Sequence, residues 1–207
     1  MKKVILVSAV LLIFAGLVSA PVAAATKVNF GLKAGVSLSN NAWSDDDGTE
    51  KILVRPTFGV FAVFNLTPML AIQPEVNYLV MGEWWGSDSL KIVEAFTYIH
   101  IPVLLKVRLM KEGKIIPALF AGPAIGFLLS AKEAGDDVKS FFKDTDFGAD
   151  FGLGAEMAAG KMKVVFDARF YLGLTNAFSR PAIVMALAPT DFTMKNRAFS
   201  LTVGVIF

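Results

Sequence analysis

Apolar and polar residues alternate with a period of two along much of the chain. In the clearest run, residues 27–38, the apolar positions are Val28, Phe30, Leu32, Ala34, Val36 and Leu38, and the residues between them are small, polar or charged. The same alternation recurs over residues 70–80 and 146–157. Because successive side chains of a β-strand point to opposite faces, this pattern predicts strands that have one face in each of two environments.

Five further segments show enough alternation to be predicted as strands, which makes eight in all. They are residues 55–65, 95–109, 115–130, 163–174 and 197–207. A strand of eleven residues tilted by about 40° rises roughly 28 Å, which matches the apolar belt of a membrane barrel, about 25 Å tall. The strand lengths therefore suit a bilayer.

The predicted connections alternate between short and long. The short ones are residues 66–69, 110–114 and 158–162, and the long ones are residues 39–54, 83–94, 131–145 and 175–196. Outer-membrane barrels have short periplasmic turns and longer extracellular loops. The alternation therefore predicts an up-and-down barrel with both termini on the periplasmic side.

The N-terminus has the layout of a secretory signal peptide. Lys2 and Lys3 precede an apolar stretch over residues 4–18, and Ala23 and Ala25 supply a small-x-small cleavage pattern. The apolar stretch is shorter than the roughly 20 residues that a membrane-spanning helix requires. We therefore expect a signal peptide over residues 1–25 and a single mature domain over residues 26–207.

Composition favours a membrane protein. Hydrophobic residues make up 55% of the chain, yet after Ala25 every apolar stretch is interrupted by charge, Gly or Pro before it could span a bilayer as a helix. A chain that enters the membrane without spanning helices must form a closed barrel. The predicted fold is therefore an all-β, eight-stranded antiparallel transmembrane β-barrel in a bacterial outer membrane.

Charge and cysteine content exclude several other classes. Loss of Lys2 and Lys3 with the signal peptide would leave 18 basic and 18 acidic residues, so nothing indicates a nucleic-acid partner. Cysteine is absent, which excludes disulfides and thiolate metal sites. We expect no cofactor and no metal; Asp45, Asp46 and Asp47 before Gly48 lack the ligand spacing of a calcium loop.

Prolines 56, 74, 102, 117 and 123 fall inside predicted strands. Proline cannot donate a hydrogen bond to the ladder, and a closed barrel has no free edge. We therefore expect bulges or strand ends at these positions.

The last predicted strand ends the sequence on an aromatic residue. Phe199, Leu201, Val203, Val205 and Phe207 share one face. Outer-membrane barrels commonly finish in this way. We expect Phe207 to be an assembly signal read by the barrel-assembly machinery.

Short motifs recur across the mature chain, at residues 98–106, 117–123, 146–148, 169–176 and 204–207, together with Gly152 and Gly154. In these motifs the chain resembles a known family, the small outer-membrane β-barrel domain proteins labelled "porin family" or PorT-like. The resemblance implies the barrel architecture and says little about activity. One departure is His100, where the family more often has an acidic or amide residue.

Candidate chemistry lies on the face predicted to point inward. This face carries nine titratable residues of both signs: Lys33, Glu75, His100, Lys106, Arg108, Asp150, Glu156, Asp167 and Arg169. They could form a proton relay, a catalytic group or a selective pore, but ion pairs filling a narrow lumen are favoured. No Ser lies at a diagnostic spacing from His100, so no catalytic residue is expected. Trp84 and Trp85 are interpreted as part of the outer aromatic girdle.

These observations favour a non-enzymatic protein with a structural or surface-interaction role. Its expected partners are outer-membrane lipid, the barrel-assembly machinery and an unidentified extracellular or envelope partner. Three alternatives stay open. They are a narrow porin-like channel for small solutes, a barrel enzyme acting on lipid, and a soluble lipocalin-like ligand-binding barrel.

Overall fold

The structure is a computed structural model that describes residues 27–43, 51–87, 90–179 and 193–207. Within these ranges the chain forms eight long strands: β1 (Lys27–Trp43), β2 (Lys51–Asn65), β3 (Leu70–Ser87), β4 (Leu90–Arg108), β5 (Ile115–Glu133), β7 (Thr145–Ala159), β8 (Met162–Gly173) and β9 (Met194–Ile206). The two-residue strand β6 (Asp136–Asp137) and the 3-10 helix η1 (Lys139–Phe141) lie between β5 and β7. The predicted signal peptide and the acidic segment at residues 45–48 lie outside the described residues.

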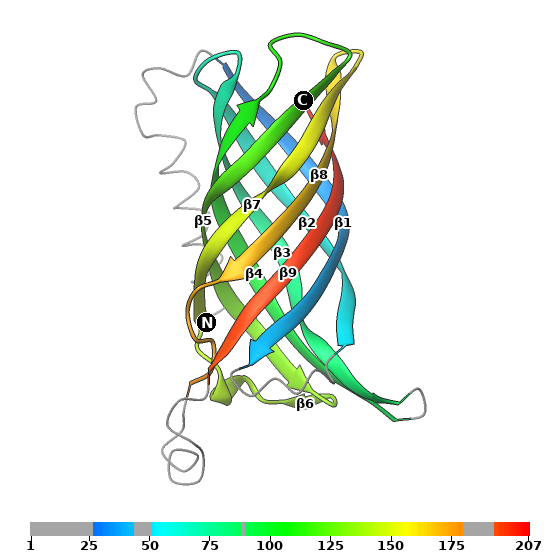
Figure 1. Cartoon of the computed structure of the whole chain (residues 1–207), viewed down its shortest axis with the longest axis vertical. Helices are drawn as coiled ribbons and strands as arrows, with labels where there is room; N and C mark the ends of the chain where they lie inside the picture. Colours follow the sequence, from blue (N-terminus) through cyan, green and yellow to red (C-terminus); the bar gives the residue numbers. More distant parts are fainter. Residues whose placement is uncertain (1–26, 44–50, 88–89, 180–192) are drawn as a thin grey trace.

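The eight long strands close into a barrel. Each strand pairs antiparallel with its neighbour in the order β4, β3, β2, β1, β9, β8, β7, β5, and β5 pairs back with β4 to complete the circle. The strands are tilted around a tall cylinder (Figure 1). The predicted fold class is therefore confirmed. In the described ranges, no helix is long and apolar enough to cross a membrane.

One end of the barrel carries the three short turns, at residues 66–69, 109–114 and 160–161, and we call it the turn end. Phe207 lies at this end as well, where its backbone N–H donates to the carbonyl oxygen of Phe30 (2.9 Å; Figure 1). We call the opposite end, with η1 and β6, the loop end. The connections predicted to be short therefore lie at one end of the barrel, and those predicted to be long lie at the other.

The strands extend further toward the loop end than predicted. Residues 39–54 and 83–94 were expected to be loops, but β1 continues to Trp43, β2 begins at Lys51, and β3 and β4 pair from Gly82↔Ala95 to Ser87↔Leu90. β8, with 12 residues, rises roughly 30 Å, whereas β4, with 19 residues, rises roughly 48 Å. The prediction was wrong here because the polar residues of these extensions are buried and hydrogen-bonded to one another. Asn41 of β1 donates to Glu83 of β3 and to Glu94 of β4.

The prolines interrupt the barrel less than expected. Pro56 lies within a register shift between β2 and β3. Pro74 and Pro102, in contrast, lie inside strands whose register is the same on both sides, and Pro123 pairs with Ala149 in a continuous ladder. A strand residue directs its N–H toward only one of its two neighbours, so proline removes one hydrogen bond without shifting the register.

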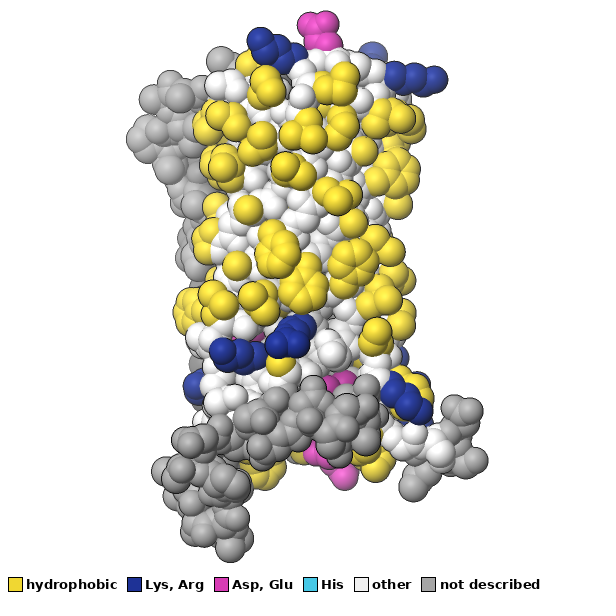
Figure 2. All heavy atoms as spheres, in the orientation of Figure 1, with side chains coloured by type: hydrophobic (Ala, Val, Ile, Leu, Met, Phe, Trp, Pro, Cys, Tyr) yellow, Lys and Arg dark blue, Asp and Glu magenta, His cyan; other side chains and the backbone are white. Residues whose placement is uncertain are grey.

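An apolar belt covers the outward face of the strands. Phe30, Leu153 and Val203 expose 51%, 61% and 51% of their surface, although each lies in a paired strand. Hydrophobic side chains cover the middle of the visible face, and Lys and Arg side chains gather toward both ends (Figure 2). The alternative of a soluble lipocalin-like barrel is wrong, because that fold turns its apolar face inward.

Glycines on the inward face allow the strands to pack closely. A Cβ atom added at Gly152 would lie 2.2 Å from the carbonyl oxygen of Ala168, and one at Gly122 would lie 2.0 Å from that of Val103. Both distances are far below van der Waals contact, so these positions require glycine.

Candidate functional site

The barrel lumen is filled at its centre by a network around Glu75. This carboxylate is fully buried and forms ion pairs with Lys33 of β1 and Arg169 of β8. It also accepts hydrogen bonds from Gln73 Nε2 (2.8 Å) and Asn77 Nδ2 (3.0 Å). A buried charge is tolerated when it is paired and its lone pairs are satisfied, and Glu75 meets both conditions.

Arg169 extends the network across the lumen. Its Nη2 atom lies 2.8 Å from Asp167 Oδ2, and its guanidinium carbon lies 4.3 Å from the ring centroid of Phe120 on β5. Side chains from β1, β3, β5 and β8 therefore meet at one level. The central level of the lumen is occupied by protein atoms.

A second group of charges lies toward the turn end, around Glu156 of β7. Its Oε1 atom lies 2.6 Å from Lys106 Nζ and 3.0 Å from Arg108 Nε, and its Oε2 atom lies 2.9 Å from Lys163 Nζ. Lys106 Nζ also donates to Gln73 Oε1 (3.2 Å), which connects this group to the central network.

A third group lies toward the loop end. His100 Nε2 lies 2.6 Å from Asp150 Oδ2, and the imidazole packs edge-on against the ring of Tyr171 at 4.6 Å. The Tyr171 hydroxyl and the Asn196 side-chain amide donate to Asp146 Oδ2 at 3.0 and 2.7 Å. Among the hydrogen bonds of the described residues, none joins His100 to a serine, so the pair lacks the nucleophile of a hydrolase triad.

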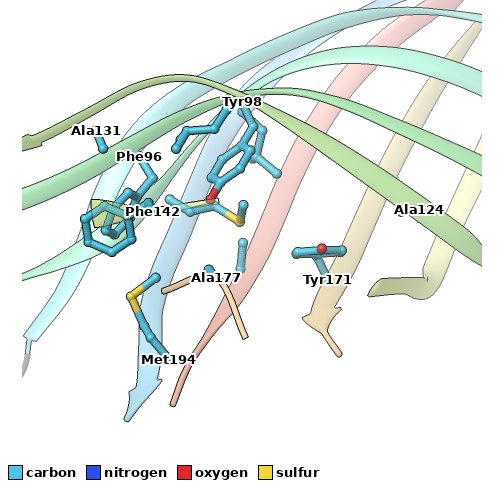
Figure 3. Close-up of a cluster of buried hydrophobic side chains, with 12 residues drawn as sticks. Phe96, Tyr98, Ala124, Ala131, Phe142, Tyr171, Ala177 and Met194 are labelled. Carbon is cyan, nitrogen blue, oxygen red and sulfur yellow. The ribbon is translucent and has the colours of Figure 1, made fainter. Parts of the chain in front are cut away.

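An apolar cluster closes the lumen beyond these polar groups. Phe142, which follows η1, packs edge-on against Phe96 of β4 with 4.6 Å between ring centroids. It also contacts Phe178, which follows β8, at 5.7 Å. Met81 and Met194 are fully buried in the same cluster, and Figure 3 shows the rings of Phe96 and Phe142 against each other.

All nine titratable residues named from the sequence lie in the lumen, each at most 9% exposed. The structure divides them among the three groups above. Sequence reasoning did not include Asp146, Lys163, Glu83 and Glu94 among these residues. Asp146 was on the inward face of its predicted strand, whereas Glu83 and Glu94 were assigned to a loop although they pair directly across β3 and β4.

Within the described ranges, the cavity near the centre of the lumen is small. A cavity of about 30 Å³ lies between the central network and the His100 group, enough for about one water molecule. A far larger cavity, about 630 Å³, opens at the turn end. In the part of the chain that the structure describes, no group of three or more His, Cys, Asp or Glu residues is arranged to hold a metal ion.

Comparison with known proteins agrees with this architecture. The chain resembles OprG from Pseudomonas aeruginosa at 11% identity and a TM-score of 0.52, over 86% of this chain and 95% of OprG. It resembles Neisserial surface protein A (NspA) at 14% identity and a TM-score of 0.53, over 87% of this chain and 97% of NspA. None of the curated proteins matches. At such identities the likeness shows the fold alone.

The family assignment comes from a separate comparison. A family model described as "Outer membrane protein beta-barrel domain" matches residues 19–179, which is most of the chain. This match, the closed barrel and its outward apolar belt together indicate that the protein lies in the outer membrane. The chain belongs to the outer membrane protein β-barrel domain family and is a bacterial outer-membrane protein.

Proposed function

We propose that this protein is a non-conducting, non-catalytic barrel that acts through its surfaces, in a structural or surface-interaction role. The observation that carries the proposal is the Glu75 network, in which Lys33, Arg169 and Phe120 meet at one level of the lumen. An eight-stranded barrel is just wide enough for side chains to fill. Solutes therefore have no continuous path through it.

The same geometry favours a filled lumen over a narrow channel. The apolar cluster of Phe96 and Phe142 lies in the lumen toward the loop end, and the cavity between it and the central network has a volume of only about 30 Å³. A solute would have to cross both an ion-paired level and an apolar level. Each crossing would leave buried charges without partners or bury a hydrated solute among aromatic rings.

Planar-bilayer recording tests this proposal. The purified wild-type protein should give no stable conductance steps in concentrated potassium chloride. The double variant Glu75→Ala/Arg169→Ala, which removes both partners of a central ion pair and shortens both side chains, should leak and serves as the positive control. Reproducible steps from the wild-type protein would favour the narrow channel and overturn the proposal.

A lipid-modifying activity is disfavoured by the position of His100. It is 3% exposed and lies inside the lumen, hydrogen-bonded to Asp150 and packed against Tyr171. His100→Gln should leave the lipid composition of the envelope unchanged. A specific change in one lipid class, absent from a strain with Lys132→Gln, would instead support an enzyme.

The proposed role places the turn end in the periplasm and the loop end outside the cell. The apolar belt would contact membrane lipid, and the extensions of β3 and β4 would present Trp84 to a partner. Lys51 and Lys91 lie 4.5 and 4.0 Å from the Trp84 ring centroid, so this surface combines cationic and aromatic groups. Photo-crosslinking from position 84 in intact envelopes, followed by identification of the captured protein, would reveal the partner.

Assembly is proposed to depend on Phe207. This side chain is 56% exposed and points outward at the turn end of the barrel. An outward aromatic at the end of the last strand is accessible to the barrel-assembly machinery. Phe207→Asp should lower the heat-modifiable, folded fraction in membranes, while Phe207→Leu, which stays apolar, should lower it less; equal folding of wild type and Phe207→Asp would contradict this role.

A further inference from the structure

The cavity of about 630 Å³ at the turn end borders the Glu156 group, with which it shares Arg108 and Lys163, and is separate from the central network and the apolar cluster. It is formed where the three short turns approach the first residues of β1 and the end of β9. Four cationic side chains line it, namely Arg108, Lys111, Lys161 and Lys163. No Asp or Glu is among the residues that line it.

Two of the four cations already form ion pairs with a buried carboxylate of the lumen. Arg108 and Lys163 contact Glu156 at 3.0 and 2.9 Å, and that carboxylate also pairs with Lys106. Lys111 and Lys161 are exposed in the turns, and within the described ranges neither forms an ion pair. Glu112, the acidic neighbour of Lys111 in the same turn, is exposed to solvent and outside the cavity lining. The side chains that line the cavity therefore carry an excess of positive charge.

The rim of the cavity continues into the apolar belt. Val28 and Phe207 line the cavity, and both point outward, with 39% and 56% of their surfaces exposed. Asn29 and Asn65 also line it, but their side chains already form hydrogen bonds. Asn65 Nδ2 donates to Asn29 Oδ1, and Asn29 Nδ2 donates to the main-chain oxygen of Phe207. The cations are thus the groups left for a ligand, and the exposed apolar residues Val28 and Phe207 border the same cavity.

We propose that the turn-end cavity is a binding site for a phosphate-bearing anion, held by Lys111 and Lys161 with support from Arg108 and Lys163. Lysine and arginine are the side chains that bind phosphate oxygens through charge-assisted hydrogen bonds. A concave site lined by one sign of charge concentrates the opposite ion. The phosphate can come from a lipid headgroup, whose acyl chains would follow the Val28 and Phe207 rim, or from a soluble compound.

Native mass spectrometry of the folded full chain tests the site with three probes. Phosphatidylglycerol carries an anionic phosphate on a lipid, phosphatidylcholine carries a phosphate whose charge is cancelled by choline, and glycerol 1-phosphate carries a phosphate without acyl chains. The wild-type protein should retain phosphatidylglycerol at least about tenfold more tightly than phosphatidylcholine. Two lysines near an anionic headgroup together contribute at least the roughly 1.4 kcal/mol that a tenfold difference in affinity represents.

The variant Lys111→Gln/Lys161→Gln should lose this preference, and Lys132→Gln/Lys195→Gln should keep it. The second pair is a matched control, because both lysines are exposed and lie at the opposite end of the barrel. The folded fraction of each variant is checked by its mobility on unheated gels. Equal retention of phosphatidylglycerol by the turn-end variant and the wild type would overturn the proposal, as would equal loss in both variants.

Glycerol 1-phosphate separates the two sources. Displacement of bound phosphatidylglycerol by glycerol 1-phosphate would show that the phosphate alone suffices, so that a soluble ligand can occupy the site. Retention of the lipid in its presence would assign the site to a membrane headgroup. Neither result bears on conductance, so failure of this site and failure of the non-conducting role are distinguishable.

Discussion

At the scale of single residues, Glu75 is the position where a small change should have the largest effect. Glu75→Gln keeps the shape of the side chain but removes the ion pairs with Lys33 and Arg169, of which Arg169 keeps its contact with Asp167. Removing one partner of a buried ion pair costs about 3 to 5 kcal/mol. We expect a loss of this size in the free energy of unfolding, measured by denaturant titration in lipid vesicles.

The double variant Lys33→Met/Glu75→Gln provides the control for this prediction. It removes one positive and one negative charge together and leaves Arg169 paired with Asp167, which lies 2.8 Å away. The double variant should therefore be more stable than Glu75→Gln alone. If the two losses simply added, the ion pair would not be the source of the effect.

At the scale of elements, a charged residue near the middle of the outward face of β7 should destabilise the folded barrel. Leu153, 61% exposed in the apolar belt, is the test position. Leu153→Arg should cost about 2 to 4 kcal/mol on folding into a bilayer, because the charge would lie near the membrane midplane. Met110→Arg places the same side chain in a turn at the edge of the barrel and should cost about 1 kcal/mol or less. Equal costs, measured by folding titrations into vesicles, would contradict the orientation of the strand faces.

The segment between β5 and β7 should depend on Phe142 for its attachment to the barrel. Phe142 is 8% exposed and packs on Phe96, whereas its neighbour Phe141 is 37% exposed. Truncating a buried aromatic costs about 3 to 5 kcal/mol where the site cannot collapse. Phe142→Ala should therefore raise trypsin cleavage at Lys139 and Lys143 by about tenfold or more through local opening. Phe141→Ala should change it little, and equal effects would argue against the apolar cluster as the anchor.

At the scale of the whole molecule, the two ends should differ in their access from outside the cell. The chain contains no cysteine, so single cysteines can report position without background. Asp136→Cys, at the loop end, should react with a membrane-impermeant maleimide in intact cells. Lys161→Cys, at the turn end, should react only after the outer membrane is permeabilised. Labelling in the opposite pattern would invert the proposed orientation.

Alternation predicted the strands and their two faces, and composition together with the lack of helical spans indicated a closed membrane barrel with its apolar face outward. Each strand has one face toward an apolar surrounding and one toward the lumen. Apolar and polar residues therefore alternate along each strand, as they do from Val28 to Leu38. The nine inward titratable residues followed from the same pattern. This information is local, because the side-chain direction of a strand residue depends only on its position in the strand.

Other features depended on which strands are neighbours and how they are shifted. Glu75 of β3 meets Arg169 of β8, which is 94 positions away in the chain, and no local pattern specifies that contact. Phe142 meets Phe96, and Lys111 and Lys161 come to line one cavity, only because the barrel closes. The loop-end extensions of β3 and β4 were missed for the same reason, since Glu83 and Glu94 form part of a strand pair only when each has the other opposite it. The sequence by itself therefore determined the faces and the number of strands, and the tertiary structure decided the ion pairs, the apolar cluster and the turn-end cavity, because these depend on register and closure.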